Sequence, residues 1–218
     1  MSFTLLVDND FVVKLAKFDA FAEGVRAIGH SPSAAASMVP MLEYMGINSE
    51  ARRRRLTTCQ AEADRLRDVL GTIEPLELTE SQSVSITQVM ETILTAELDV
   101  DEGELMLLVV AVEASWSDLA TGDKRALLAL PSLQGYWAAV GQLRERLICL
   151  EQAIARLCKH HGVPWVKQRI RAAPEADTTL REAVNHAKGM KDSDFTRLIQ
   201  HLVKHQLASS LPGWLKNL

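Results

Sequence analysis

The chain opens with a short apolar run that ends in polar residues. Residues 3–7 are apolar apart from Thr4, and Asp8, Asn9 and Asp10 follow directly. From residue 11 onward, apolar side chains recur at helical spacing. A short apolar run with polar flanks is typical of a buried parallel strand, and steps of three and four residues are typical of one helix face. The pattern predicts a strand that delivers Asp8 into a helix reaching about residue 28.

A second arrangement of this kind lies near the middle of the chain. After Glu104, apolar residues recur at three- and four-residue steps, which predicts a helix with one buried face. Residues 118–121 then resemble a short strand that ends at Gly122 and Asp123, and residues 124–130 have the composition of another helix. In open α/β sheets, ligands bind beside the carboxyl ends of the strands. Asp123 and Glu104 are therefore expected to meet at one edge of a sheet.

The rest of the pattern predicts mainly helices. Helices are expected at residues 33–45, 49–70 and 79–98, and residues 73–78 are short enough for a strand that Pro75 would place at a sheet edge or convert to a loop. Beyond Pro131, residues 133–161 read as one long amphipathic helix, followed by helices near 165–172, 178–188 and 192–208. The long helix carries an apolar ladder that could pack across the domain or against a second copy, formed by Leu143, Leu147, Leu150, Ile154 and Leu157.

Composition narrows the class of protein. The chain has 218 residues, of which 47% are apolar and 24% are charged, as expected for a soluble globular protein. Its three cysteines are scattered, which favours a reducing compartment over a disulfide scaffold. The first ten residues lack a basic segment, and no stretch approaches 18 continuous apolar residues. We expect a cytoplasmic protein that does not cross a membrane.

The net charge of −4 hides an asymmetry between the two ends of the chain. Residues 146–218 contain 12 Lys and Arg against 6 Asp and Glu, a net of +6, so residues 1–145 carry −10. An acidic module joined to a basic helical one suits a metal-binding catalytic domain with an arm that attracts polyanions. A set of solvated amphipathic helices explains the basic arm equally well.

Two blocks of residues, in this order, resemble a PIN-like (PilT N-terminus) nuclease domain. The first is the strand and helix around Asp8, and the second runs from Asp101-x-Gly103-Glu104 through an apolar helix to Thr121-Gly122-Asp123. The resemblance implies an α/β fold, namely a three-layer α/β/α domain with a short central parallel sheet over residues 1–131. Residues 132–218 would then form a basic, C-terminal all-helical extension that binds substrate or a partner.

The resemblance also implies the chemistry of the site. Hydrolysis of a phosphodiester requires charge neutralisation and an activated water, which bound Mg²⁺ or Mn²⁺ can supply, and these hard cations prefer oxygen ligands. By motif, Asp8, Glu104 and Asp123 match the family's metal ligands, and Thr121 matches a small hydroxyl residue that could orient a metal-bound water. Asp10 departs from the family pattern, and it could be a second ligand or could replace Asp8 if the strand continued to it.

Other residues extend this candidate site. Asp101, Glu102 and Glu43 are further carboxylates that could complete it, whereas Asp118 begins the strand and is expected at the far end of the sheet. Four basic residues are candidate phosphate contacts, although surface solvation explains them equally well: Lys124, Arg125, Arg52 and Arg53.

The resulting function is a metal-dependent endonuclease, with RNA expected as substrate over DNA. It would act as a toxin or defence effector under the control of an inhibitor or activating protein, and a homodimer is a further hypothesis. One alternative is a non-catalytic PIN-like module that binds nucleic acid or protein. Another is an all-helical regulatory protein or a HEPN-like metal-independent ribonuclease, because Arg156-x4-His161 matches the loose motif of that family. The chain has no Walker A loop, GxGxxG or GxSxG motif, which argues against the usual nucleotide-binding and serine-hydrolase classes.

Overall fold

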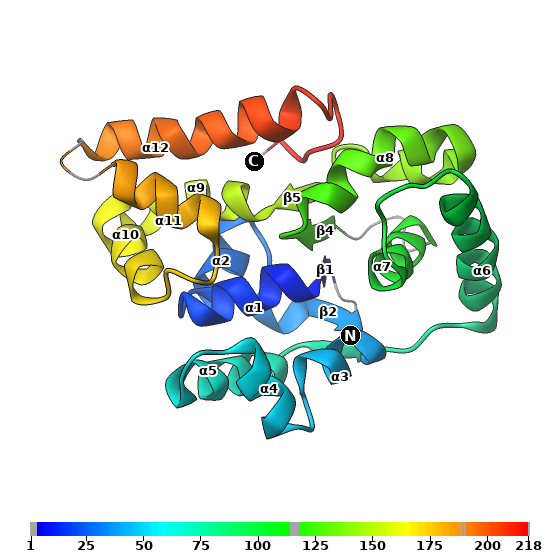
Figure 1. Ribbon diagram of the computed structural model, residues 1–218, viewed down its shortest axis with the longest axis horizontal. Coiled ribbons are helices and arrows are strands. Elements are labelled where there is room, and N and C mark those ends of the chain that lie inside the picture. Colours follow the sequence, from blue (N-terminus) through cyan, green and yellow to red (C-terminus); the bar gives the residue numbers. More distant parts are fainter. Residues whose placement is uncertain (1–3, 114–117, 188, 190, 218) are drawn as a thin grey trace.

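A five-stranded, all-parallel sheet forms the centre of the protein (Figure 1). The computed structural model describes residues 4–113, 118–187, 189 and 191–217. The strand order is β3-β2-β1-β4-β5, and every neighbouring pair is parallel. The strands are β1 (Leu5–Val7), β2 (Ala35–Met38), β3 (Glu74–Leu76), β4 (Asp118–Thr121) and β5 (Leu147–Cys149). The chain is thus an α/β protein.

Helices connect the strands and cover both faces of the sheet (Figure 1). They are α1 (Asn9–Lys17), α2 (Phe21–Ala27), α3 (Val39–Met45), α4 (Glu50–Leu56), α5 (Gln60–Leu70), α6 (Glu80–Thr95), α7 (Glu102–Glu113), α8 (Lys124–Tyr136), α9 (Leu150–His161), α10 (Val163–Ala172), α11 (Thr178–His186) and α12 (Asp192–His201). Three further helical segments are not α-helical: the 3-10 helices η1 (Pro32–Ala34) and η2 (Ala138–Leu143), and the π-helix η3 (Leu202–Ala208).

Alternation along the strands divides the core into two clusters. Leu5 and Val7 of β1 pack into one cluster, and Leu6 between them packs into the other. Successive strand side chains point to opposite faces of a sheet, so the two clusters lie on its two faces. One cluster takes residues from α1, α2 and α9 to α12, and the other takes residues from α6, α7 and α8. Helices on both faces are consistent with a three-layer α/β/α arrangement.

Several sequence predictions are confirmed. The predicted first strand is β1, of which Phe3 lies outside the described residues, and residues 118–121 form β4. Residues 73–78 contain β3, which lies at the sheet edge as Pro75 required. Asp118 lies at the far end of β4 from Asp123, where His30 and Lys216 contact its carboxylate.

The helix predicted for residues 33–45 is wrong in its first half. Ala35–Met38 is instead the fully buried strand β2, which pairs with β1 and β3. Its Ser37 hydroxyl donates to the carbonyl of Val7 at 2.9 Å, and α3 begins only at Val39, with Pro40 in its first turn. Small side chains allow this strand to lie in the middle of the molecule, where its neighbours supply the backbone hydrogen bonds. The helix predicted for residues 49–70 is likewise divided into α4 and α5.

The all-helical extension is also wrong, because β5 adds a strand to the sheet from residues 147–149. The predicted long helix of residues 133–161 is instead the end of α8, η2, β5 and α9. The boundary predicted at residue 131 falls inside α8, which continues through Pro131. The same sheet contradicts the alternative of an all-helical protein.

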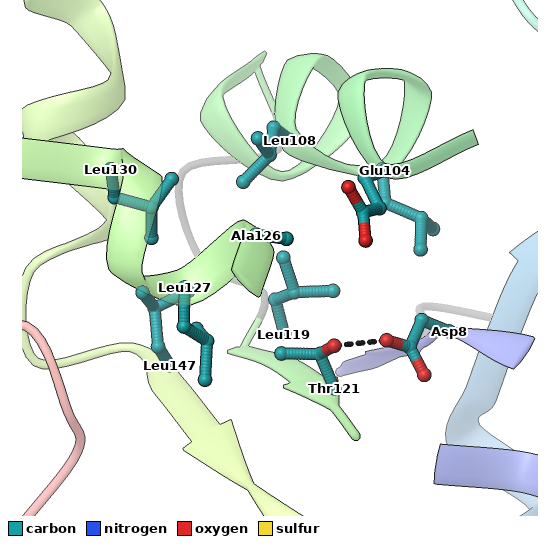
Figure 2. A pocket seen from close by; sticks show the side chains of 10 residues that line it. Asp8, Glu104, Leu108, Leu119, Thr121, Ala126, Leu127, Leu130 and Leu147 are labelled. Atoms are coloured by element: carbon teal, nitrogen blue, oxygen red, sulfur yellow. Dashed lines mark hydrogen bonds between the residues drawn. The ribbon is translucent and has the colours of Figure 1, made fainter. Parts of the chain in front are cut away.

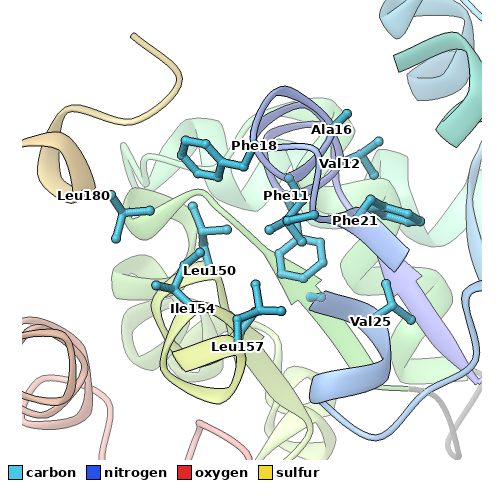
Figure 3. Close-up of a cluster of buried hydrophobic side chains, with 14 of the residues drawn as sticks. Phe11, Val12, Ala16, Phe18, Phe21, Val25, Leu150, Ile154, Leu157 and Leu180 are labelled. Atoms are coloured by element: carbon cyan, nitrogen blue, oxygen red, sulfur yellow. The ribbon is translucent and has the colours of Figure 1, made fainter. Parts of the chain in front are cut away.

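The C-terminal part of the chain shares a core with the N-terminal part. Figure 3 shows Phe11 and Phe18 of the first helical segment beside Leu150 and Leu157 of α9 and Leu180 of α11. The predicted dimer ladder, residues 143–157, lies in these cores, where its five apolar members are at most 1% exposed. It is therefore unavailable as an interface between two copies. Among the described residues, no helix combines the length and apolarity needed to cross a membrane.

Candidate functional site

An open cavity of about 780 Å³ lies at the carboxyl edge of the sheet. Asp8 follows β1 directly and Asp123 follows β4, so the parallel strands bring both to this edge. The start of α7 lies opposite and contributes further carboxylates. The acidic residues that line the cavity are Asp8, Asp10, Asp101, Glu102, Glu104 and Asp123. The structure thus places the four predicted metal ligands around one cavity.

Asp8 is buried at the start of α1 and caps that helix. The backbone N–H of Phe11 donates to Asp8 Oδ1 at 2.7 Å, and the hydroxyl of Thr121 donates to Asp8 Oδ2 (Figure 2). Burial raises the pKa of Asp8 to about 6, although these hydrogen bonds favour the charged form and offset part of the effect. Thr121 Oγ1 also accepts from the backbone N–H of Asp123 at 2.9 Å. Thr121 therefore joins two of the predicted ligands.

Glu104 faces the cavity from the first turn of α7. Its backbone N–H donates to Asp101 Oδ1 at 2.8 Å, and its own carboxylate accepts from the N–H of Asp101 at 2.9 Å. Figure 2 shows the carboxyl groups of Glu104 and Asp8 on facing elements, to one side of leucines of α7, β4 and α8. Burial beside these leucines, together with the charges of Asp101 and Asp123, raises the pKa of Glu104 to about 8.

Asp123 caps α8 and is held in its charged form. Its Oδ1 accepts from the backbone N–H of Arg125 at 2.7 Å, and the Arg125 guanidinium donates to Oδ2 at 2.7 Å. Burial opposes ionisation, but these bonds from Arg125 and the N–H of Ala126 hold the pKa of Asp123 below its usual range. The cavity thus combines one stabilised carboxylate with two that burial makes costly to ionise.

Gly122 allows the loop after β4 to touch the start of α1. A Cβ atom at Gly122 would lie 3.0 Å from Asp10 Cβ, 3.1 Å from Asp10 C and 3.2 Å from the Phe11 nitrogen. Because two of these neighbours are backbone atoms, a side chain here would force the two segments apart. The close approach keeps Asp8, Thr121 and Asp123 within one network.

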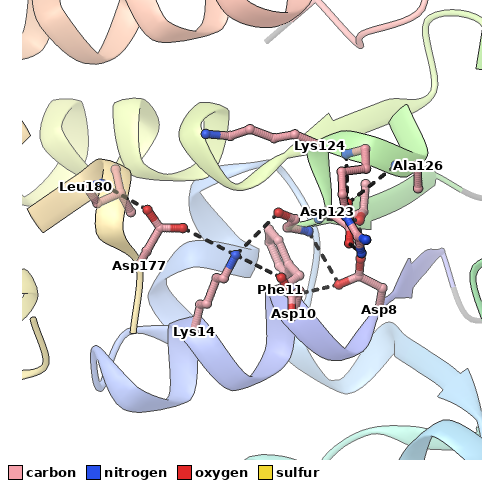
Figure 4. Close-up of polar contacts among 12 residues, drawn as sticks. Asp8, Asp10, Phe11, Lys14, Asp123, Lys124, Ala126, Asp177 and Leu180 are labelled. Atoms are coloured by element: carbon pink, nitrogen blue, oxygen red, sulfur yellow. Dashed lines mark hydrogen bonds and ion pairs between the residues drawn. The ribbon is translucent and has the colours of Figure 1, made fainter. Parts of the chain in front are cut away.

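Lys14 and Asp177 flank the site and were not found from the sequence. Lys14 Nζ lies 2.9 Å from Asp10, 3.3 Å from Asp177 and 3.4 Å from the carbonyl oxygen of Gly122 (Figure 4). Burial opposes the charge, but Asp10 and Asp177 hold the pKa of Lys14 above its usual range. Asp10 is therefore paired with a lysine at the cavity rim. The i,i+4 spacing of Asp10 and Lys14 on one helix is a sequence signal for their ion pair. No local signal indicates Asp177, because it comes from a distant segment before α11.

Only one of the four predicted phosphate contacts lines the cavity, namely Arg125. Lys124 Nζ instead lies 2.5 Å from the buried carboxylate of Glu151, and Figure 4 shows its side chain directed away from Asp8. Arg53 is 7% exposed and donates to the carbonyl of Gly46, which leaves it unavailable to a nucleic acid.

Two further predicted residues, Arg52 and Glu43, are not among those that line the cavity. Arg52 donates to the carbonyl of Glu43 at 2.7 Å. The side chain of Glu43 is exposed and is not among those that line the cavity, so the structure does not bring it to the other carboxylates.

The carboxylates fit a hard divalent cation in their chemistry. Within the described part of the chain, no three His, Cys, Asp or Glu side chains are close enough to form a ready-made metal site. Asp8, Glu104 and Asp123 nevertheless supply oxygen donors around one cavity, and the raised pKa values of Asp8 and Glu104 reflect burial and repulsion that a cation would relieve.

Arg156 and His161 do not share a cavity. Arg156 lines a basic cavity of about 490 Å³ together with Lys159 and Lys216. His161 stacks on Trp165, with ring centroids 4.7 Å apart, and lines a different cavity beside Glu23. This separation argues against the metal-independent Arg and His ribonuclease.

Comparisons of the chain with protein-family models, with curated proteins and with solved structures found no match.

Proposed function

We propose that this chain is a PIN-like endonuclease that uses Mg²⁺ or Mn²⁺ to hydrolyse phosphodiester bonds, with RNA as its substrate. One observation carries the proposal: Asp8, Glu104 and Asp123, from three separate segments, line a single open cavity at the carboxyl edge of a parallel sheet. Carboxylates that must repel one another without a cation are typical of sites for hard metal ions.

Each residue has a defined part in this function. Asp8, Glu104 and Asp123 would hold the metal, with Asp10 or Asp101 as additional oxygen donors. When bound, the ion neutralises the phosphate oxygens and lowers the pKa of a coordinated water.

The neighbouring residues position these ligands. Thr121 holds Asp8 through its hydroxyl, and the N–H groups of α8 orient Asp123. Arg125 lies at the cavity rim, where its guanidinium can pass from Asp123 to a substrate phosphate.

The C-terminal part would supply attraction for the nucleic acid. Arg156 and Lys159 line one basic cavity together with Lys216, whose Nζ also contacts the carboxylate of Asp118. Cationic side chains of this kind bind phosphate backbones without reading sequence.

We place the enzyme in the cytoplasm as a toxin or defence effector, controlled by an inhibitor or activating protein.

A non-catalytic binding module is the second candidate. The lack of three ready-made ligands among the described residues favours it, because a scaffold needs no metal. Such a module would bind RNA with the same affinity in Mn²⁺ and in EDTA, and would cleave none of it.

Cleavage of labelled RNA and single-stranded DNA in Mn²⁺, Mg²⁺ or EDTA tests the proposal. The key variant is Asp123→Asn, which keeps the shape of the side chain but removes the charge that would hold the metal. We expect cleavage that requires metal and falls by at least about 100-fold in the variant, on the order of the loss of one key transition-state contact.

Asp68→Asn is the matched control. Asp68 lies on α5, is 76% exposed at its side chain and contacts only Arg67 among the ion pairs of the described residues. Its substitution should leave cleavage unchanged. Cleavage that persists in EDTA, or that Asp123→Asn leaves intact, would overturn the metal-dependent mechanism.

A further inference from the structure

The cavity has two walls of different chemistry. Asp8 and Asp123 lie on one side, where α1 and α8 begin. The other side is contributed by α3 and the first turns of α7, and it includes the carboxylates of Glu102 and Glu104. Between and beside these carboxylates lie four apolar side chains, which we call the apolar wall: Pro40, Met41, Tyr44 and Met106. The carboxylate of Glu104 serves the proposed metal, but a metal and a phosphate alone would leave the apolar wall without a ligand to contact.

Tyr44 is the aromatic residue of the apolar wall, and its side chain is exposed. It is 61% exposed, whereas Met41 and Met45 on the same helix are buried and fix α3 to the core. Exposed aromatic rings at the edge of a cavity are available to stack on a planar ligand.

Two arginines of α4 hold the C-terminal end of α3, which carries Tyr44. Arg52 donates to the carbonyl of Glu43 at 2.7 Å, and Arg53 donates to the carbonyl of Gly46 just after the helix. Each carbonyl also accepts a backbone N–H, from Gly46 and Ser49 respectively, so the arginines add a second hydrogen bond at the end of α3. The tyrosine is thus mounted on a rigid support, and the arginines act as positioning residues for it.

We propose that the apolar wall binds an unpaired nucleobase stacked on Tyr44, so that the substrate is a single-stranded nucleic acid. This inference rests on the proposed nuclease function. Without a bound cation the carboxylates repel phosphates, whereas a base is uncharged and presents an apolar face. In a duplex both faces of each internal base are already stacked on neighbouring bases, so Tyr44 could not reach them. A strand lying across the cavity would place a phosphate at the carboxylates and the adjacent base on Tyr44.

The test measures binding separately from cleavage. Binding is followed by fluorescence anisotropy in Ca²⁺, a hard cation with the same preference for oxygen ligands. The probes are a labelled single-stranded RNA of ten nucleotides, its blunt-ended duplex, and a ten-unit abasic ribose phosphate. The proteins are the native chain, Tyr44→Ala, Tyr44→Phe and Tyr136→Ala. Tyr136 is the matched control, because it is 62% exposed but does not line the cavity.

We expect Tyr44→Ala to raise the Kd for single-stranded RNA by about 5- to 150-fold, the range for loss of one stacked base. Tyr44→Phe keeps the ring and should stay within about two-fold of the native chain, and Tyr136→Ala should match it. The duplex and the abasic strand should bind weakly to every protein. In Mn²⁺, Tyr44→Ala should raise the KM for cleavage more than it lowers kcat.

The outcomes separate this inference from the nuclease function. Binding that depends on Tyr44 without any cleavage would support base stacking and overturn the nuclease. Cleavage with equal binding by Tyr44→Ala and the native chain would overturn base stacking and leave the nuclease in place. Equal binding of the abasic strand or the duplex would also overturn the stacked base, and absence of both binding and cleavage would overturn both proposals.

Discussion

At the scale of single residues, the site holds carboxylates in an unfavourable environment. Asp8 is buried, and its hydrogen bonds from Phe11 and Thr121 only partly offset the cost of its charge. A buried group of this kind lowers the stability of the folded state when it is ionised. In a site that binds a cation, this loss of stability is offset when the cation binds and neutralises the carboxylate.

The raised pKa of Asp8 predicts how stability depends on pH. Its pKa is about 6 in the folded protein, against 3.8 for a solvated aspartate side chain such as that of the unfolded chain. Between these values the folded state binds more protons, so this group's contribution to stability falls as pH rises and is fully unfavourable above about pH 6. We expect Asp8→Asn, which keeps the helix cap, to be more stable than the native chain by about 2 to 3 kcal/mol at pH 7.5 without metal.

Urea unfolding in EDTA from pH 4 to 8 measures this difference. The advantage of Asp8→Asn should vanish near pH 4, where Asp8 of the native chain is protonated in the folded state. Asp68→Asn, on the surface of α5, should show no such trend. A difference between Asp8→Asn and the native chain that stays constant with pH would contradict the assignment to Asp8.

At the scale of elements, the site depends on close contact between the loop after β4 and the start of α1. Gly122 contacts the backbone of Asp10 and Phe11, while Thr121 and the N–H of Gly122 reach Asp8. The loops that carry Asp8 and Asp123 can therefore pack closely because Gly122 has no side chain.

Gly122→Ala should disturb this contact. The added methyl group must move backbone atoms by a few tenths of an ångström, which we expect to lower stability by about 1 to 3 kcal/mol. Cleavage should fall by at least about ten-fold, since small displacements of reacting groups are costly. Cleavage rates in Mn²⁺, together with thermal unfolding, measure both effects.

Gly135→Ala is the matched control, because a Cβ at Gly135, inside α8, would meet no atom within 4 Å. It should leave cleavage unchanged and raise stability by about 0.5 to 1 kcal/mol through a better helix propensity. If the two variants behaved alike, the tight contact at Gly122 would not be what holds the site.

At the scale of the whole molecule, the two ends of the sequence form one folding unit. Phe11 and Phe18 share a core cluster with Leu150, Leu157 and Leu180, and β5 covers the edge of β4. Lys14 and Asp177 add an ion pair between the two parts beside the site. Residues beyond 131 are therefore part of the fold that positions the carboxylates.

This shared core predicts the behaviour of a fragment. A chain of residues 1–131 would expose the apolar face that α9 and α11 cover, and would leave β4 as an open sheet edge. We expect it to lack a cooperative thermal transition by circular dichroism and to cleave no RNA. A fragment with a cooperative transition and native cleavage would instead support a separate domain that ends at residue 131.

The sequence alone determined the segments whose character is local. A short apolar run before Asp8 identified β1, and residues 118–121 before the turn at Gly122 and Asp123 identified β4. The helical spacing after Glu104 identified α7. Because ligands bind beside the carboxyl ends of parallel strands, these segments also predicted that Glu104 and Asp123 would meet at one edge of the sheet. The resemblance to PIN-like domains implied that Asp8 joins them. Such features depend on side-chain order along a few residues, which a single sequence displays in full.

Only the tertiary structure decided the strands whose local pattern favours a helix. Ala35–Met38 precedes methionines at helical spacing, and Leu147–Cys149 lies within a ladder of the same period, yet both become strands. Their backbone hydrogen bonds come from segments far away in the sequence, so pairing overrides local preference. The Lys14–Asp177 pair, the burial of Arg53 and the apolar wall around Tyr44 likewise arise from contacts between distant segments, which no local pattern encodes.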